Sequence, residues 1–463
     1  MAEVVDVASI PQLNGIFAPT HDELDAPLEV VEGALPTDLS GAYLRNGPNP
    51  RFTPLGSYLY PLDGDGMVHG VWFDGGTARY RNRYVRTPAI AAEEAAGRAL
   101  WPGVMTGETP TEEEVGPELA GTERDLVDIH VVRHGGRLLA LAEGERPFEL
   151  DDQLGTVGPY TFGGDLMGMC AHPKIDPATG EMIVFRYGIE SEPWLTWAVV
   201  GADGAVTRAP TELPLAGPTM IHDCAITPTH LLLVVCPLRF DFEAMFRGEP
   251  LLSWRPDDGT EWLAVPRDGG PVVRATTEAF WVWHVANAFD HDGHIVVDLP
   301  WWSHPGMGLV QTPASGGTAR FAIDLASATV TRTEVDDQLG EFPRLDDRGT
   351  GDRHGWFHEA GKDPDHPPTV AGEWNRLLRY DVDGGRFQER RAGARRYGEA
   401  VFVPRSPDAA PDDGYVLTYE YDPGATTTDL VLLDGTDIAA PPVCRLRVPH
   451  RVPFGLHGSW LPA

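Results

Sequence analysis

Short apolar runs separated by turn residues are the feature that most constrains how this chain can fold. Runs of β-type residues occur at 137–143, 181–187, 230–236, 294–299, 415–421 and 429–433. Turn residues stand between them, and the 52 glycines and 42 prolines are spread along the whole chain. Helical patterns are confined to 89–101 and, more weakly, to 241–246. Many short strands without βαβ alternation predict an all-β barrel, sandwich or propeller, and 463 residues favour a propeller.

Charge and composition exclude several classes of protein. The sequence has 36 Lys and Arg against 69 Asp and Glu, so its net charge of −33 would repel a phosphate backbone, and no nucleic-acid partner is expected. No stretch of 18 apolar residues occurs, and residues 1–20 lack the basic and apolar regions of a signal peptide. The four cysteines form no CxxC pair, so a reduced, cytoplasmic protein is expected. Peripheral contact with a membrane stays open.

Four of the sixteen histidines occur in apolar segments bounded by glycine or proline. They are His172, His222, His284 and His457, and an imidazole without a partner is costly to bury in such surroundings. Their successive spacings are 50, 62 and 173 residues, the last being close to three times 58. Repeated units of this length would place the four at equivalent positions, where they could converge on one ion at the axis of a propeller. The spacing alone is explained equally well by four buried histidines that have no common function.

Seven ordered motifs extend along most of the chain. They are Leu44-Arg45-Asn46-Gly47-Pro48-Asn49-Pro50, Leu62-Asp63-Gly64-Asp65-Gly66-Met67, and the segments 171–176, 221–227, 283–289, 341–344 and 453–462. Together they resemble the carotenoid cleavage oxygenases from Gly41 to the C-terminus. The resemblance implies a seven-bladed β-propeller, with a cap of loops and helices over a non-haem iron on the axis. It also implies that residues 1–463 form a single domain of this type, with residues 1–35 as an N-terminal extension packed on it.

The resemblance also implies roles for individual residues. The family's four iron ligands fall on His172, His222, His284 and His457. The three carboxylates that accept hydrogen bonds from ligand histidines in the family fall on Glu143, Glu341 and Glu399. Such a carboxylate fixes the tautomer of a ligand, so that the other ring nitrogen faces the metal, and its charge offsets that of the ion. The cofactor implied is Fe(II).

A threonine that shields an open coordination position in many family members is replaced in this chain. Fourteen residues before Glu143 the sequence has Ile129, preceded by Asp128. Ile129 is predicted to plug that position sterically. The change from Asn-Thr to Asp128-Ile129 leaves the coordination geometry open, and the neighbouring His130 is assigned no role.

The activity implied is oxidative cleavage of a conjugated C=C bond by Fe(II) and O2, which gives two carbonyl products. Apolar or aromatic walls are expected around the alkene, and the residues predicted for them are Phe52, Tyr84, Ala142, Trp283, Phe289 and Phe454. Stilbene-cleaving members that recognise a phenol carry a lysine at the position of Ala142, so an apocarotenoid or carotenoid is favoured here. A stilbenoid or an isoeugenol-like phenylpropene stays open as the substrate. An alternative function also stays open, that of a propeller which isomerises or binds a lipid without cleaving it.

Overall fold

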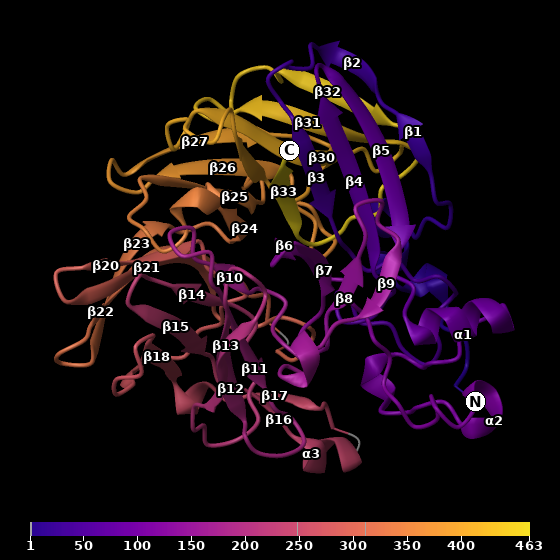
Figure 1. Cartoon of the computed structure of the whole chain (residues 1–463), viewed down its shortest axis with the longest axis horizontal. Helices are drawn as coiled ribbons and strands as arrows, with labels where there is room; N and C mark the ends of the chain where they lie inside the picture. The colour runs from indigo at the N-terminus through magenta and orange to yellow at the C-terminus, as the bar shows by residue number, and fades with distance from the viewer. Residues whose placement is uncertain (1, 248, 311) are drawn as a thin grey trace.

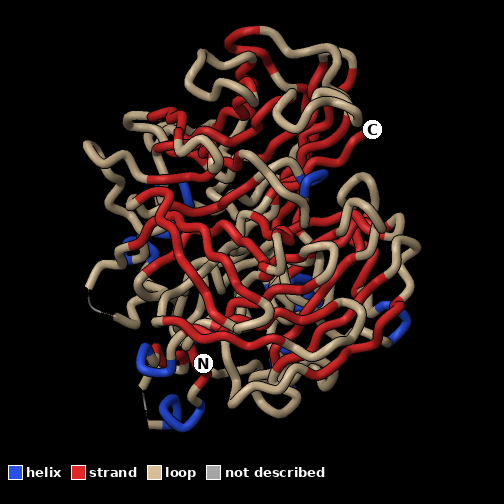
Figure 2. The backbone as a smooth tube through the Cα atoms, turned by 90° about the vertical axis from the view of Figure 1, so that its left-hand side faces the viewer, coloured by secondary structure: helices blue, strands red, loops and turns tan. Residues whose placement is uncertain are grey.

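The computed structural model describes residues 2–247, 249–310 and 312–463. Strands and loops make up most of the backbone, and helices are few (Figure 2). Within these residues, seven antiparallel sheets of four or more strands surround a central axis (Figure 1). The predicted seven-bladed β-propeller is therefore confirmed.

Five of the blades are four-stranded sheets, each formed by one stretch of the chain. In spatial order their strands are β6 (His130–His134), β7 (Arg137–Leu141), β8 (Phe148–Leu150) and β9 (Thr156–Pro159); β10 (Lys174–Ile175), β11 (Met182–Tyr187), β12 (Leu195–Val200) and β13 (Val206–Glu212); β14 (Cys224–Ile226), β15 (His230–Val235), β18 (Thr260–Pro266) and β19 (Val273–Thr277); β20 (Asn287–His291), β21 (His294–Trp302), β22 (Gly316–Asp324) and β23 (Thr329–Asp336); and β24 (Gly340–Arg344), β25 (Trp356–Gly361), β26 (Arg376–Asp381) and β27 (Arg386–Arg391). A separate hairpin, β16 (Leu238–Phe240) and β17 (Leu252–Trp254), is inserted between β15 and β18.

The other two blades combine strands from both ends of the chain. One contains β1 (Asp25–Pro27), β5 (Thr77–Tyr84), β4 (Met67–Asp74), β3 (Gly41–Arg45) and the last strand β33 (Gly458–Pro462). The other contains β2 (Glu29–Gly33), β32 (Cys444–Val448), β31 (Thr428–Asp434), β30 (Gly414–Tyr421) and β28 (Arg396–Tyr397), with β29 (Val401–Pro404) also paired to β30. The ring is thus closed twice by pairing the first part of the chain with the last. Residues 1–35 supply β1 and β2, and the division into one domain with an extension stays a prediction.

The first strands of the blades form an inner ring around the axis. β33 lies next to both β29 and β6, and β14 lies next to both β10 and β20. All of β14 is buried, whereas the outer strand β13 is largely exposed. The side chains of the inner strand β14 are therefore withdrawn from water.

The α-helices of the described residues lie in connections between strands. They are α1 (Pro88–Ala96), α2 (Glu112–Val115) and α3 (Phe242–Phe246), and all three lie at the lower part of Figure 1. The helix predicted over 89–101 ends earlier because Gly97, at φ +69°, takes the left-handed conformation that stops an α-helix. None of the described helices is both long and apolar enough to cross a membrane. A cap over the histidines stays a prediction.

Removing the closing strand is expected to destroy the cooperative unfolding of the protein. Deletion of residues 458–463 removes β33, whose Leu461 and Ser459 face Ala42 and Leu44 in the ladder, and leaves β3 as an open edge. Thermal unfolding followed by circular dichroism should lose its sharp transition. Deletion of Ala463 alone, which follows β33, is the control and should unfold like the full chain. A sharp transition at an unchanged temperature in the longer deletion would contradict this account of ring closure.

Candidate metal centre

The four predicted histidines occupy equivalent places in four blades. Each lies one to three residues before the innermost strand of its blade: His172 before β10, His222 before β14, His284 before β20 and His457 before β33. The inner strands β24 and β29 lie between the last two, which explains the long final spacing. Because the inner strands all approach the axis, the residues at their beginnings meet there although 285 positions separate the first from the last.

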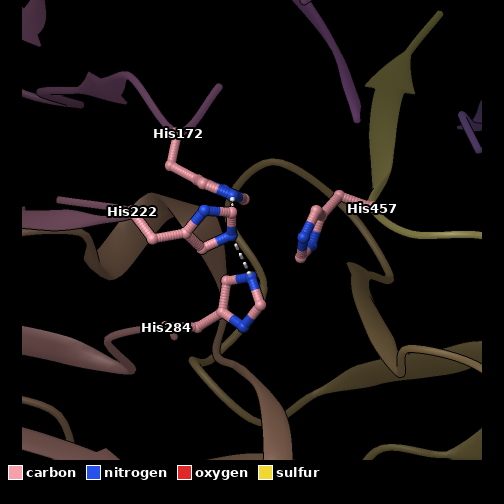
Figure 3. A group of neighbouring side chains, drawn as sticks. All are labelled: His172, His222, His284 and His457. Carbon is pink, nitrogen blue, oxygen red and sulfur yellow. Dashed lines mark hydrogen bonds between the residues drawn. The ribbon is translucent and has the colours of Figure 1, made fainter. Parts of the chain in front are cut away.

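The structure brings these four side chains together, with their rings pointing toward one another (Figure 3). One ring nitrogen from each lies within 4.8 Å of those of the others. His222 Nε2 is 3.2 Å from His172 Nε2 and 3.3 Å from His284 Nε2. All four residues are buried, and the most exposed, His284, retains 9% of its surface.

Three glutamates bind the outer nitrogens of three of these rings. His222 Nδ1 donates to Glu143, and His284 Nδ1 donates to Glu341. His457 Nδ1 donates to Glu399 over 2.9 Å. The Tyr187 hydroxyl also donates to Glu143 and holds that carboxylate in place. A histidine that donates from Nδ1 and is neutral has a lone pair at Nε2, so the inner nitrogens are acceptors.

The electrostatics of the cluster fit a transition-metal ion. Burial lowers the pKa of His284 to about 3, and it also lowers the pKa values of His172 and His457. For His222, burial lowers the pKa, but the Glu143 carboxylate outweighs it and the net shift is upward. When both rings are neutral and donate from Nδ1, the Nε2 lone pairs of His222 and His284 face each other across 3.3 Å. A cation between them removes that mismatch, and imidazole nitrogens are ligands that iron and its neighbours accept.

Ile129 occupies the corresponding place in a fifth blade, directly before β6. Its carbonyl accepts from His457 N over 3.2 Å, and its own N–H donates to Leu141 O over 3.0 Å. The side chain is 4% exposed. The backbone of Ile129 thus lies beside a histidine of the cluster, and the steric plug stays a prediction.

Two side chains to which the sequence assigned no role lie against the histidines. The Phe342 ring stacks on His284 with centroids 5.6 Å apart and meets His457 at 5.4 Å. His130 lies between His172 and His457, with ring centroids 5.9 and 5.6 Å away. The only signal for either was its place next to a predicted residue, Glu341 or Ile129.

A cavity of about 750 Å³ borders the cluster. Its lining includes His172, His284 and His457, together with Phe342 and His130. The volume lies within the range of small-molecule sites in proteins. A small molecule in this cavity can therefore reach three of the four histidines.

A family model described as retinal pigment epithelial membrane protein matches residues 17–462, nearly the whole chain. The chain belongs to the carotenoid cleavage oxygenases. Apocarotenoid-15,15'-oxygenase of Synechocystis sp. is 31% identical over 466 residues, which cover 95% of this chain and 94% of the relative. Isoeugenol monooxygenase of Pseudomonas putida is 30% identical over 477 residues, covering 97% and 98%. The crystal structure of Pseudomonas brassicacearum lignostilbene dioxygenase matches with a TM-score of 0.91 and 30% identity, covering 98% and 99%.

These similarities confirm the family predicted from the motifs, and the protein is an oxygenase of that family. Its relatives are named for three kinds of alkene: apocarotenoids, isoeugenol and lignostilbenes. The propeller of this chain and those of its structural relatives extend over almost the same length. The family therefore limits the reaction type more closely than it limits the substrate.

In this carotenoid cleavage oxygenase, three of the predicted pocket residues lie next to the cluster residues in space or in sequence. The Trp283 ring meets His222 edge-on, with centroids 5.2 Å apart. Ala142 is buried directly before Glu143. Phe454, three residues before His457, packs on the rings of Phe17 and Tyr421. None of these three residues lines the 750 Å³ cavity, so their part in substrate binding stays a prediction.

The other three predicted pocket residues make their contacts outside the histidine cluster. The Tyr84 hydroxyl accepts from Asn49 Nδ2 over 2.6 Å and donates to Thr20 O over 3.0 Å. Phe52 borders a separate cavity of about 30 Å³. The Phe289 ring lies 5.8 Å from that of His354. A part for these three in substrate binding stays a prediction.

Proposed function

We propose that the protein is an Fe(II) oxygenase that uses O2 to cleave a conjugated C=C bond of an apocarotenoid or carotenoid into two carbonyl products. The observation that carries this proposal is the cluster of four buried imidazoles, three of which donate from Nδ1 to glutamates. Four neutral nitrogen donors leave two positions of an octahedral ion for small ligands. The iron, when bound, would supply the reactivity toward O2 that amino-acid side chains lack.

The side chains around the cluster would bind and orient the alkene. Trp283 and Phe342 present flat apolar rings beside His222 and His284, and such rings suit a planar conjugated chain. Ile129 would keep water from the side of the ion next to His457. The protein's part in the reaction would be to hold the double bond close to the ion in a dry cavity.

The preference for an apocarotenoid rests on Ala142, which replaces the lysine used by phenol-recognising members of the family. A methyl group gives this buried position no fixed cation for a phenolate. Cleavage of a phenylpropene or stilbenoid is the second candidate function. It is supported by the isoeugenol monooxygenase and lignostilbene dioxygenase relatives, which are about as similar to the chain as the apocarotenoid oxygenase.

Incubation with a panel of alkenes under ¹⁸O2 tests the proposal. Iron-loaded protein is expected to convert one or more apocarotenals into shorter aldehydes carrying ¹⁸O, read by mass spectrometry, and to leave hydroxystilbenes and isoeugenol largely intact. Labelled vanillin-type aldehydes from the phenolic substrates would support the second candidate instead. An isomerised or merely bound polyene without labelled aldehydes would identify a non-cleaving isomerase or lipid-binding propeller.

A cytoplasmic location and peripheral contact with membranes belong to the same proposal. All four cysteines are free, buried thiols, as expected in a reducing compartment. Val4, Val104 and Met105 are exposed apolar side chains. They lie on one part of the surface because Leu55 bridges to both Val4 and Pro102. Such a patch would bring a lipophilic substrate to the protein from a membrane.

A further inference from the structure

His172 differs from the other three histidines in what holds it. Glu143, Glu341 and Glu399 accept hydrogen bonds from His222, His284 and His457, whereas among the described residues no carboxylate hydrogen-bonds the His172 ring. A ligand histidine without such an acceptor depends on its backbone and on its packing for its orientation. Other contacts must therefore fix the segment that carries His172.

His130 hydrogen-bonds the residue directly before His172. Its Nδ1 lies 3.2 Å from the carbonyl oxygen of Ala171. A carbonyl can only accept, so Nδ1 carries the proton of the neutral ring and Nε2 is an acceptor. Nε2 lies 3.1 Å from Oγ of Ser459, a residue of β33 two positions after His457, but the Ser459 hydroxyl donates to the carbonyl of Val131 over 2.7 Å and leaves no proton for His130. One imidazole thus contacts two histidine-bearing segments from distant parts of the chain and hydrogen-bonds the one that carries His172.

His130 lies between two histidines of the cluster and is held there by one hydrogen bond. Its Nδ1–H donates to the Ala171 carbonyl, while Nε2 contacts Ser459 Oγ without receiving its proton. Its ring packs on His172 and meets His457 edge-on, and it lines the 750 Å³ cavity beside them. It begins β6 directly after Ile129, whose carbonyl accepts from His457 N. The same short segment therefore contacts both ligand histidines through backbone and side chain.

We propose that His130 is a positioning residue that fixes His172 against His457 and so sets the metal affinity and coordination geometry of the site. It would serve His172 as the glutamates serve the other three histidines, with the Ala171 carbonyl as the point of attachment. The inference rests on the proposed function because it takes the four histidines to be metal ligands.

Metal affinity of a matched set of variants tests the proposal. His130→Ala removes the hydrogen bond to Ala171 O, whereas His130→Asn keeps a donor at the position of Nδ1 and can still reach that carbonyl. Co(II) binding to the full chain, measured by competition with a chelator, should weaken by about 10–100-fold in His130→Ala, as for other residues that orient ligands. The Co(II) absorption bands should change as well. His130→Asn should recover most of the affinity.

His134→Ala is the control for a general loss of stability. His134 is the other histidine of β6, and one of its ring nitrogens, Nε2, lies 2.9 Å from the carbonyl of Gly180 in the neighbouring blade, much as His130 Nδ1 lies near the carbonyl of Ala171. The two alanine variants should lower the unfolding temperature of the metal-free protein alike, but His134→Ala should bind Co(II) like the unmodified protein. Unchanged affinity and bands in His130→Ala, or an equal loss in His134→Ala, would overturn the proposal. Absence of Co(II) binding by the unmodified chain would overturn the metal site itself, and the positioning role with it.

Discussion

Replacing His284 with alanine is expected to abolish metal binding and turnover. The His284 ring supplies one of four nitrogens that lie within 4.8 Å of one another, and its Nε2 is 3.3 Å from that of His222. Its loss removes a quarter of the donors and leaves Glu341 buried without the histidine that donates to it. Iron content measured after purification from iron-supplemented medium should fall close to zero. Turnover should fall by more than about 100-fold, beyond the effect expected of a residue that only orients a ligand.

A second histidine outside the cluster provides the matched control for this change. His354 is 8% exposed, and its Nε2 lies 2.9 Å from Asp298, so it too is a buried imidazole beside a carboxylate. His354→Ala should retain the iron content and turnover of the unmodified protein, even where its unfolding temperature falls. Full iron content in His284→Ala, or equal loss of iron in both variants, would contradict the role of His284 as a ligand.

Changing Glu143 to glutamine is expected to leave the fold intact and to weaken metal binding or activity by about 10–100-fold. Glutamine has nearly the same shape, but it lacks the negative charge that favours the Nδ1–H tautomer of His222. The Glu143 carboxylate is also what raises the pKa of His222 against the effect of burial. Without that charge, His222 should exchange between tautomers and present a lone pair at Nε2 for only part of the time.

Glu149 supplies the control for the loss of a carboxylate in the same blade. It lies on β8 and pairs with Arg137 over 2.6 Å, outside the histidine cluster. Glu149→Gln should therefore keep both metal affinity and turnover, measured by the same chelator competition and product analysis. A Glu143→Gln protein that binds iron and turns over like the unmodified protein would show that this carboxylate does not orient a ligand.

The sequence predicts the fold class because the strands of a propeller blade are short and their turns are local. The β-type runs at 137–143, 181–187 and 230–236 correspond to β7, β11 and β15. The pairing that closes the ring joins β33 to β3, strands more than 400 positions apart. No local pattern encodes such a pairing, and the resemblance to a family implied the propeller without predicting which strands close it.

For the candidate site, too, local sequence indicates the residues but not the contacts between blades. The surroundings of the four histidines are unusual enough to single them out, but their convergence depends on each preceding an inner strand. His130 and Phe342 were missed because their importance arises from contacts with residues of other blades. Phe289 and Phe52 were predicted to line the pocket, but their contacts lie elsewhere. The position of an aromatic residue near a motif does not indicate in which direction its ring points.

Anomalous diffraction at the iron edge, from crystals of the iron-loaded protein, tests the central claim most directly. The claim is that four imidazoles from four blades bind one ferrous ion at the axis of the propeller. The account predicts a single strong anomalous peak bounded by the Nε2 atoms of His172, His222, His284 and His457, at bonding distance from each. A peak at any other group, or no peak between these rings in protein shown to contain iron, would contradict it.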